Sequence, residues 1–248
     1  MTAAPFPGFS AAAFEFFRGL ADNNDPNWFK PRKAVYENEV LAPFRTLIVA
    51  LGTALGEAGL PLVGDPDHGM FRIYRDVRFS KNKQLYKTHA AAVLTRSGRK
   101  RDPGLLYLHL EPGRSLAGAG FWHPEPALLA RLRRAILDDP DGFLAMAQRL
   151  AALGYPLTCE NERLSRPPRG FETAKGGPVA DYVCWKNFIV EAALVDAEMQ
   201  SADVVKRIVD FAATIRPLLE WGWDAADDEA PPPLIMHIPS RPLPKPDF

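Results

Sequence analysis

Four short strand-like runs constrain the fold of this 248-residue chain more than any other feature. They are rich in β-branched, aromatic and other apolar residues, which favour strands, and they span Phe71–Phe79, Ala90–Arg96, Leu105–Glu111 and Ser115–Trp122. Because short turns separate the later runs, the pattern predicts an antiparallel meander. Gly118 and Gly120, inside the last run, indicate a bulge or a place where another group approaches the backbone closely.

Helical patterns precede the strands. Ser10 is a suitable N-cap for a first helix. A second helix is expected to open at Pro31 and to be ended or kinked by Pro43. Apolar residues then recur at helical spacing from Phe44 to Leu55. The first sixty residues are therefore predicted to form a helical layer.

Further helices and one more strand follow the meander. Two amphipathic patterns lie between residues 123 and 154, a long strand is expected over Tyr182–Leu194, and Ser201 caps a last helix. No linker divides the body. We expect one α+β domain over residues 1–229, with an antiparallel sheet of about four meander strands plus the later strand, flanked by helices. Residues 230–248 contain seven prolines and are expected to form an extended tail.

Charge is balanced overall but unevenly spread. The chain has 30 basic and 30 acidic residues, yet the stretch from Met70 to Arg101 holds ten basic residues and a single acid, Asp76. Its local charge is +9, and the rest of the chain sums to −9. Such a block attracts anions even in a neutral protein.

The first part of this block, Arg72–Lys87, carries the main functional prediction. On a strand, Arg75 would share an apolar face with Phe71 and Ile73, and burying its charge alone would be costly. Three hypotheses follow: a small-anion site, a nucleic-acid surface, or an ion-pair network that holds the strand against the helical layer. The candidate binding residues are Arg72, Arg75, Asp76, Arg78, Ser80, Lys83, Tyr86 and Lys87.

Other chemistry has little support in the sequence. The five histidines are scattered and the two cysteines lack CxxC spacing, so neither a metal site nor a cofactor is predicted. A general acid or base would have to be Asp76, Tyr86 or His89, and whether the protein is an enzyme stays open. The few cysteines, and the lack of a signal-peptide pattern or of a long apolar run, predict a cytoplasmic protein without a membrane span.

Several of these residues also match a known pattern. Arg75-Asp76-Val77-Arg78-Phe79-Ser80 is followed by Tyr86-Lys87, and preceded by Asn23-Asn24 and Trp28-Phe29. Over roughly residues 6–220 the chain resembles the domain of unknown function 2461, an uncharacterised, mostly bacterial family. The common Thr-Pro before Tyr-Lys is replaced here by Gln84-Leu85, which leaves the turn of this loop open. The family has no assigned activity, so the resemblance implies no catalytic residue.

The prediction from sequence is therefore the binding of a small anionic ligand that carries phosphate or carboxylate. The alternative is a non-catalytic interaction or nucleic-acid-binding protein whose basic cluster is structural. The oligomeric state is left open.

Overall fold

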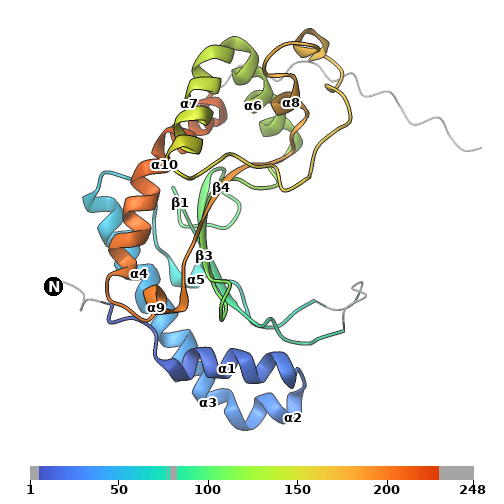
Figure 1. The fold of residues 1–248 in the computed structure, drawn as a ribbon. Helices are drawn as coiled ribbons and strands as arrows, with labels where there is room; N and C mark the ends of the chain where they lie inside the picture. Colours follow the sequence, from blue (N-terminus) through green and yellow to red (C-terminus); the bar gives the residue numbers. More distant parts are fainter. Residues whose placement is uncertain (1–5, 77, 79–82, 229–248) are drawn as a thin grey trace, which may run out of the picture.

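A four-stranded antiparallel sheet lies at the centre of the molecule (Figure 1). The computed structural model describes residues 6–76, 78 and 83–228. The strands follow one another in space as in the sequence: β1 (Ala90–Thr95), β2 (Leu105–Leu110), β3 (Leu116–Phe121) and β4 (Phe188–Ala193). The predicted α+β class is confirmed: helices flank an antiparallel sheet to which a later strand is added.

Two long helices cover one face of the sheet. They are α4 (Ala42–Glu57) and α10 (Val204–Asp227), which contact each other as well as β1 and β3 respectively. The side chains beneath them are apolar, as in Leu106, Leu108 and Leu110 of β2, which are all fully buried. Burial of this face is the main source of stability for such a layer.

The N-terminal helices are less regular than their sequence pattern predicts. After α1 (Ala11–Asp22), one continuous helical stretch begins at Pro26, not at Pro31, because Asp25 caps it by accepting hydrogen bonds from the Asn27 and Trp28 amides. In order, the stretch comprises α2 (Pro26–Phe29), η1 (Lys30–Arg32), α3 (Lys33–Val35) and the π-helical η2 (Tyr36–Leu41), and it ends with α4.

Pro43 does not end this helix. Proline has no N–H for the carbonyl four residues earlier and its ring crowds that carbonyl. The π turn directly before it widens the helix, and α4 then continues to Glu57. The whole helix Pro26–Glu57 is long and apolar enough, by length and composition, to cross a membrane. Packing in the protein core accounts for its apolar side, which is completely buried at Phe44, Leu47, Ile48, Leu51 and Leu55.

A second group of helices forms the other end of the molecule (Figure 1). It contains α6 (Pro126–Asp138), α7 (Pro140–Ala152), η3 (Glu172–Ala174) and α8 (Ala180–Cys184). The long strand expected over Tyr182–Leu194 is wrong in its first half, since α8 occupies it and β4 begins only at Phe188. Short helices α5 (Pro66–Gly69) and α9 (Asp196–Met199) complete the described elements.

The run expected to be the first strand is extended but does not join the sheet ladder. Within its described part Tyr74 makes an isolated bridge with Tyr86, and Met70, directly before the run, makes one with Ala92. The Arg75 amide donates to the Leu85 carbonyl, and the Lys87 amide to that of Ile73. We call residues 70–76 and 83–89 the basic ribbon. Val77, Phe79 and Ser80, like the proline-rich tail, lie outside the described residues.

The glycines of β3 do not form a bulge. Both neighbours of β3 pair with it in continuous register. At Gly120, φ is +128° and an added Cβ would lie 2.1 Å from the Phe188 carbonyl oxygen, so this glycine permits the close approach of β4.

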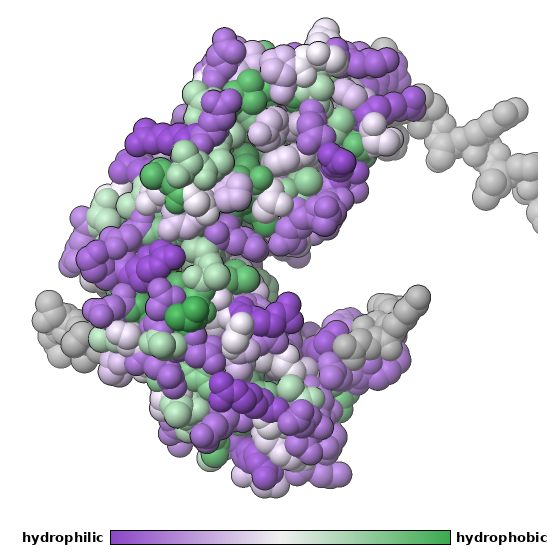
Figure 2. Space-filling model, viewed as in Figure 1, coloured by the Kyte–Doolittle hydropathy of each residue, from purple (hydrophilic) through white to green (hydrophobic). Residues whose placement is uncertain are grey.

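The basic ribbon and the second helical group stand on either side of a deep hollow (Figure 2). The uncovered face of the sheet carries Tyr107 and Gly118, which pair with each other, and Glu191, which pairs with Gly118.

Candidate functional site

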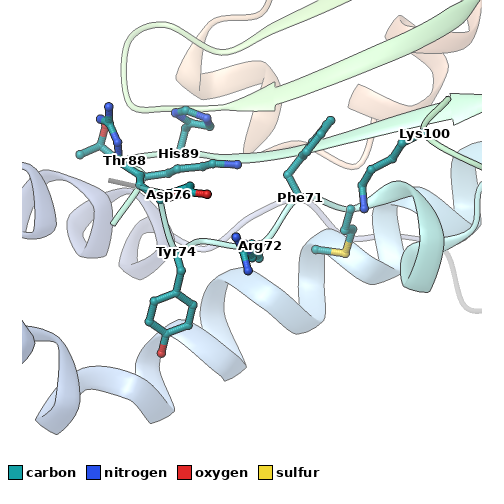
Figure 3. A pocket seen from close by; sticks show the side chains of 10 residues that line it. Phe71, Arg72, Tyr74, Asp76, Thr88, His89 and Lys100 are labelled. Carbon is teal, nitrogen blue, oxygen red and sulfur yellow. The ribbon is translucent and has the colours of Figure 1, made fainter. Parts of the chain in front are cut away.

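A pocket of about 730 Å³ is lined by residues of the basic ribbon and by Lys100 of the loop after β1, and we call it the basic pocket. Four cationic side chains line it, together with one acid, Asp76; the cations are Arg72, Arg75, Lys87 and Lys100. Figure 3 shows Asp76, Thr88 and His89 at one end of the pocket and Phe71 with Lys100 at the other. The ribbon and the loop after β1 thus bring together charges far apart in the sequence.

These cations have few partners of opposite charge. Within residues 6–76, 78 and 83–228, no ion pair joins Arg72, Arg75, Lys87 or Lys100 to a carboxylate. The ammonium groups of Lys87 and Lys100 lie 5.1 and 5.3 Å from the centre of the Phe71 ring, at cation–π distance. Burial, and then the positive charges of Arg72, Lys100 and Arg75, lower the pKa of Lys87.

Asp76, the acid in the lining, forms its ion pair with Arg78, and the charge of Arg72 also acts on it. Its carboxylate accepts two hydrogen bonds from the Arg78 guanidinium, at 3.0 and 2.7 Å, outside the lining of the pocket. These bonds hold the pKa of Asp76 below its usual value. Both side chains are well exposed, so the pair contributes little to stability.

Aromatic packing and one asparagine hold the ribbon in place. The Asn24 side chain donates to the Tyr86 carbonyl (3.0 Å) and accepts from the Tyr86 amide (2.9 Å). The Tyr86 ring stacks on Phe29 with centroids 4.3 Å apart. Burial, followed by Tyr74 and Asp25, raises the pKa of the Tyr86 hydroxyl. These contacts attach the ribbon to the helical layer.

Some of the binding residues predicted from sequence line the basic pocket and others do not. Arg72, Arg75, Asp76 and Lys87 line the basic pocket. Tyr86 lies in the aromatic core, only 5% exposed, and Arg78 and Lys83 are exposed outside the lining. Ser80 falls outside the described residues, and Lys100 joins the pocket although it was not among the predicted site residues.

A polar network borders the same pocket on the uncovered face of the sheet. Tyr107 Oη lies 2.9 Å from His109 Nδ1, and His109 Nε2 lies 3.2 Å from Glu111 Oε2. The Thr88 hydroxyl donates to Glu111 Oε1 (3.2 Å), and the His89 ring lies 4.3 Å from that of His109. A carboxylate only accepts, so Nε2 of His109 carries the proton and Nδ1 accepts from Tyr107.

Burial shifts the pKa values of this network. It lowers the pKa of His89 to about 4, and the neighbouring His109 acts in the same direction. It also lowers the pKa of His109, although the hydrogen bond to Glu111 opposes the shift. Burial and then the charges of Glu111 and Glu191 raise the pKa of Tyr107 to about 12. At neutral pH both imidazoles and the phenol are therefore uncharged.

Sequence reasoning missed this network, although a signal was present. Tyr107, His109 and Glu111 alternate along one strand and so must share one face. Their connection to His89 depends on the register of β1 with β2, which places Ala90 opposite Leu110.

A second pocket of about 400 Å³ adjoins the first at Phe71 and Lys100. Tyr107, Glu160 and Glu191 contribute to its lining. Burial, and then the nearby Glu160, raise the pKa of Glu191. The uncovered face thus carries acids at one end and the cations of the basic pocket at the other.

Comparison with known proteins identifies the family. The model of the family described as "conserved hypothetical protein (DUF2461)" matches residues 12–221. The chain belongs to this family. The match to the domain of unknown function 2461 includes the basic ribbon and all four strands, as the resemblance in the sequence predicts. No curated protein and no solved structure is significantly similar to the chain.

Proposed function

We propose that the basic pocket binds a small anionic ligand that carries a phosphate or carboxylate group. The observation that carries this proposal is the group of four cations, Arg72, Arg75, Lys87 and Lys100, around one pocket without a carboxylate paired to any of them among the described residues. Such a group is repulsive by itself, and an anion in the pocket would relieve the repulsion. Arginine also offers a planar fork that matches both phosphate and carboxylate.

The depressed pKa of Lys87 supports the same conclusion. Three of the charges that lower it belong to the pocket, and an anion among them would raise it again. A purely structural role for the cluster has less support, because Asn24 and the Tyr86–Phe29 stack already hold the ribbon.

A small anion is also favoured over nucleic acid. The cations line one pocket together with Phe71 and His89. Among the described aromatic residues of the ribbon, Tyr86 is buried and Phe71 has cations over its ring, which leaves Tyr74 (51% exposed) to stack with a base. Non-specific single-strand binding usually uses several such rings along a groove.

Thermal melts with inorganic phosphate test the proposal. We expect a saturable rise in melting temperature for the wild-type protein, because a ligand that binds only the folded state stabilises it. Lys100→Ala and Lys87→Ala should each weaken this rise. Arg101→Ala is the matched control, since Arg101 is an exposed cation in the same loop as Lys100 but does not line the pocket.

Three results would contradict the proposal. An equal rise in wild type and in the Lys87 and Lys100 variants would indicate a general salt effect, and no rise at all would remove phosphate as a ligand. Tighter binding of single-stranded oligonucleotide than of phosphate, with an affinity that falls steeply with salt, would favour the nucleic-acid alternative.

A further inference from the structure

His89, His109 and Glu111 form a second cluster, which the anion proposal does not use. Each offers one ligand atom, and these three atoms all lie within 4.8 Å of one another. The residues are partly buried on the uncovered face of the sheet. They come from two adjacent strand ends whose register is set by backbone pairing, so the sheet fixes their relative positions.

The spacing in this cluster is suited to a metal. Bonds of about 2.0 Å in a tetrahedral zinc site place neighbouring ligand atoms about 3.3 Å apart. His109 Nε2 and Glu111 Oε2 are already 3.2 Å apart. The 4.8 Å limit leaves only a short movement of the remaining ligand.

The surroundings of the cluster also resemble those of a metal site. Ligating residues are usually oriented by hydrogen bonds to their other polar atoms. Here Tyr107 Oη contacts the second ring nitrogen of His109, and the Thr88 hydroxyl donates to the second oxygen of Glu111. Both contacts leave His109 Nε2 and Glu111 Oε2 facing each other, where an ion could replace the hydrogen bond between them.

We propose that His89, His109 and Glu111 bind a divalent transition-metal ion, for which Zn²⁺ is the best match. Two imidazoles and one carboxylate are ligands that zinc accepts, and three protein ligands leave a position open. When the ion binds His109 Nε2, the ring proton moves to Nδ1, which then donates to the Tyr107 oxygen. No net proton is released by this tautomer change.

The open position would face the basic pocket. His89 and Thr88 belong to the lining of that pocket (Figure 3). The metal's charge and the pocket cations repel each other, so an anion in the pocket should tighten metal binding and the metal should tighten anion binding by the same factor. This coupling rests on the proposed function, whereas the metal site itself does not.

Equilibrium dialysis of the full chain against Zn²⁺, after treatment with a chelator, tests the metal site. We expect one ion per chain at micromolar Zn²⁺. Glu111→Gln and His109→Gln should each weaken binding by at least about tenfold, and Tyr107→Phe by roughly tenfold. Co²⁺ in place of Zn²⁺ should give visible absorption bands of low-symmetry coordination, and these should disappear in Glu111→Gln.

His123→Gln is the matched control. His123 is exposed and its Nε2 lies 3.3 Å from Glu162 Oε1, and among the described residues this pair belongs to no group of three possible metal ligands. Its replacement should leave Zn²⁺ binding unchanged. Far-UV circular dichroism and melts without metal show whether each variant folds. If His109→Gln does not fold, Tyr107→Phe still tests the site.

Two results would overturn the metal site: no stoichiometric Zn²⁺ binding by the wild type, or binding that is equal in wild type, Glu111→Gln and Tyr107→Phe. The second would place the ion elsewhere, for example at the buried Cys159 or Cys184. If Zn²⁺ binds but phosphate neither tightens it nor stabilises the protein, the metal site stands and the anion proposal fails. If phosphate stabilises the protein but Zn²⁺ does not bind, the anion proposal stands and the metal site fails.

Discussion

The two faces of the central sheet are built from different kinds of side chain. On β2, residues Leu106, Leu108 and Leu110 point toward α4 and α10 and are at most 2% exposed. Leu105, Tyr107 and His109 alternate with them on the uncovered face and are partly exposed. The first face is explained by apolar packing alone. Half-buried imidazole, phenol and carboxylate groups contribute little to packing and cost free energy to desolvate, so apolar packing does not explain the second face.

A pair of neighbouring substitutions separates the two faces most clearly. Leu108→Ala should lower the free energy of unfolding by about 2–5 kcal/mol, because it leaves a cavity beneath the helices. His109→Gln, one residue away, should cost less, about 0.5–1.5 kcal/mol for each of its two hydrogen bonds that the glutamine does not replace. Chemical denaturation in chelator measures both. A larger loss for His109→Gln than for Leu108→Ala would mean that the polar network is structural.

The substitution Asn24→Ala tests whether Asn24 holds the basic ribbon, and with it the basic pocket, in position. Asn24→Ala removes both hydrogen bonds to the Tyr86 backbone and leaves two part-buried groups unpaired, so we expect a loss of roughly 1–3 kcal/mol. The melting-temperature rise with phosphate should shrink as the ribbon loosens. Asn23→Ala is the control, since the Asn23 side chain makes only a local bond to Gly19. Equal effects of both substitutions would show that Asn24 does not position the pocket.

The smallest expected effect concerns pH. The pKa of His89 is about 4 in the fold and 6.5 ordinarily, so between these values the unfolded chain binds a proton that the folded chain does not. In metal-free protein, stability should therefore fall as pH drops from about 6.5 to about 4, by on the order of 1 kcal/mol for a partly exposed ring.

His89→Asn should flatten this part of the pH profile, and His123→Asn should not. The measurement is a series of melts in chelator from pH 7 to pH 4. Profiles of wild type and His89→Asn that run parallel would show that His89 titrates alike in the folded and unfolded chain.

The sequence predicts the elements of the covered face better than the residues that meet on the uncovered face. Period-two and helical patterns locate β1, β2 and β3 and the long helices, because apolar burial requires these spacings. The Tyr182–Leu194 run is largely apolar, and such a run fits a buried helix as well as a strand, which is why α8 was missed. The run Phe71–Phe79 is predicted as a strand from its residue types. In its described part, its backbone contact with the sheet is the bond from the Phe71 amide to Ala91, beside the isolated bridge of Met70 with Ala92.

The residues of the candidate site also divide into those that the sequence predicts and those that it does not. Arg72, Arg75 and Lys87 are found from local charge density. Lys100 enters the pocket across the loop after β1, and His89 meets Glu111 only through strand register. Non-local pairing of this kind is set by the whole fold and not by neighbouring residues.

The π turn Tyr36–Leu41 has a consequence for insertions and deletions in this helix. It holds one residue more than an α-helical turn needs, and each residue rotates an α-helix by about 100°. Deleting a single residue there would let the turn close to a regular α-helix and keep the upstream part near its present phase, whereas deleting one residue between Phe29 and the turn would rotate Phe29 by about 100° away from Tyr86. The turn is thus the place in this helix that best tolerates the loss of one residue, and the segment between it and Phe29 is the place where such a loss would disturb the aromatic cluster most.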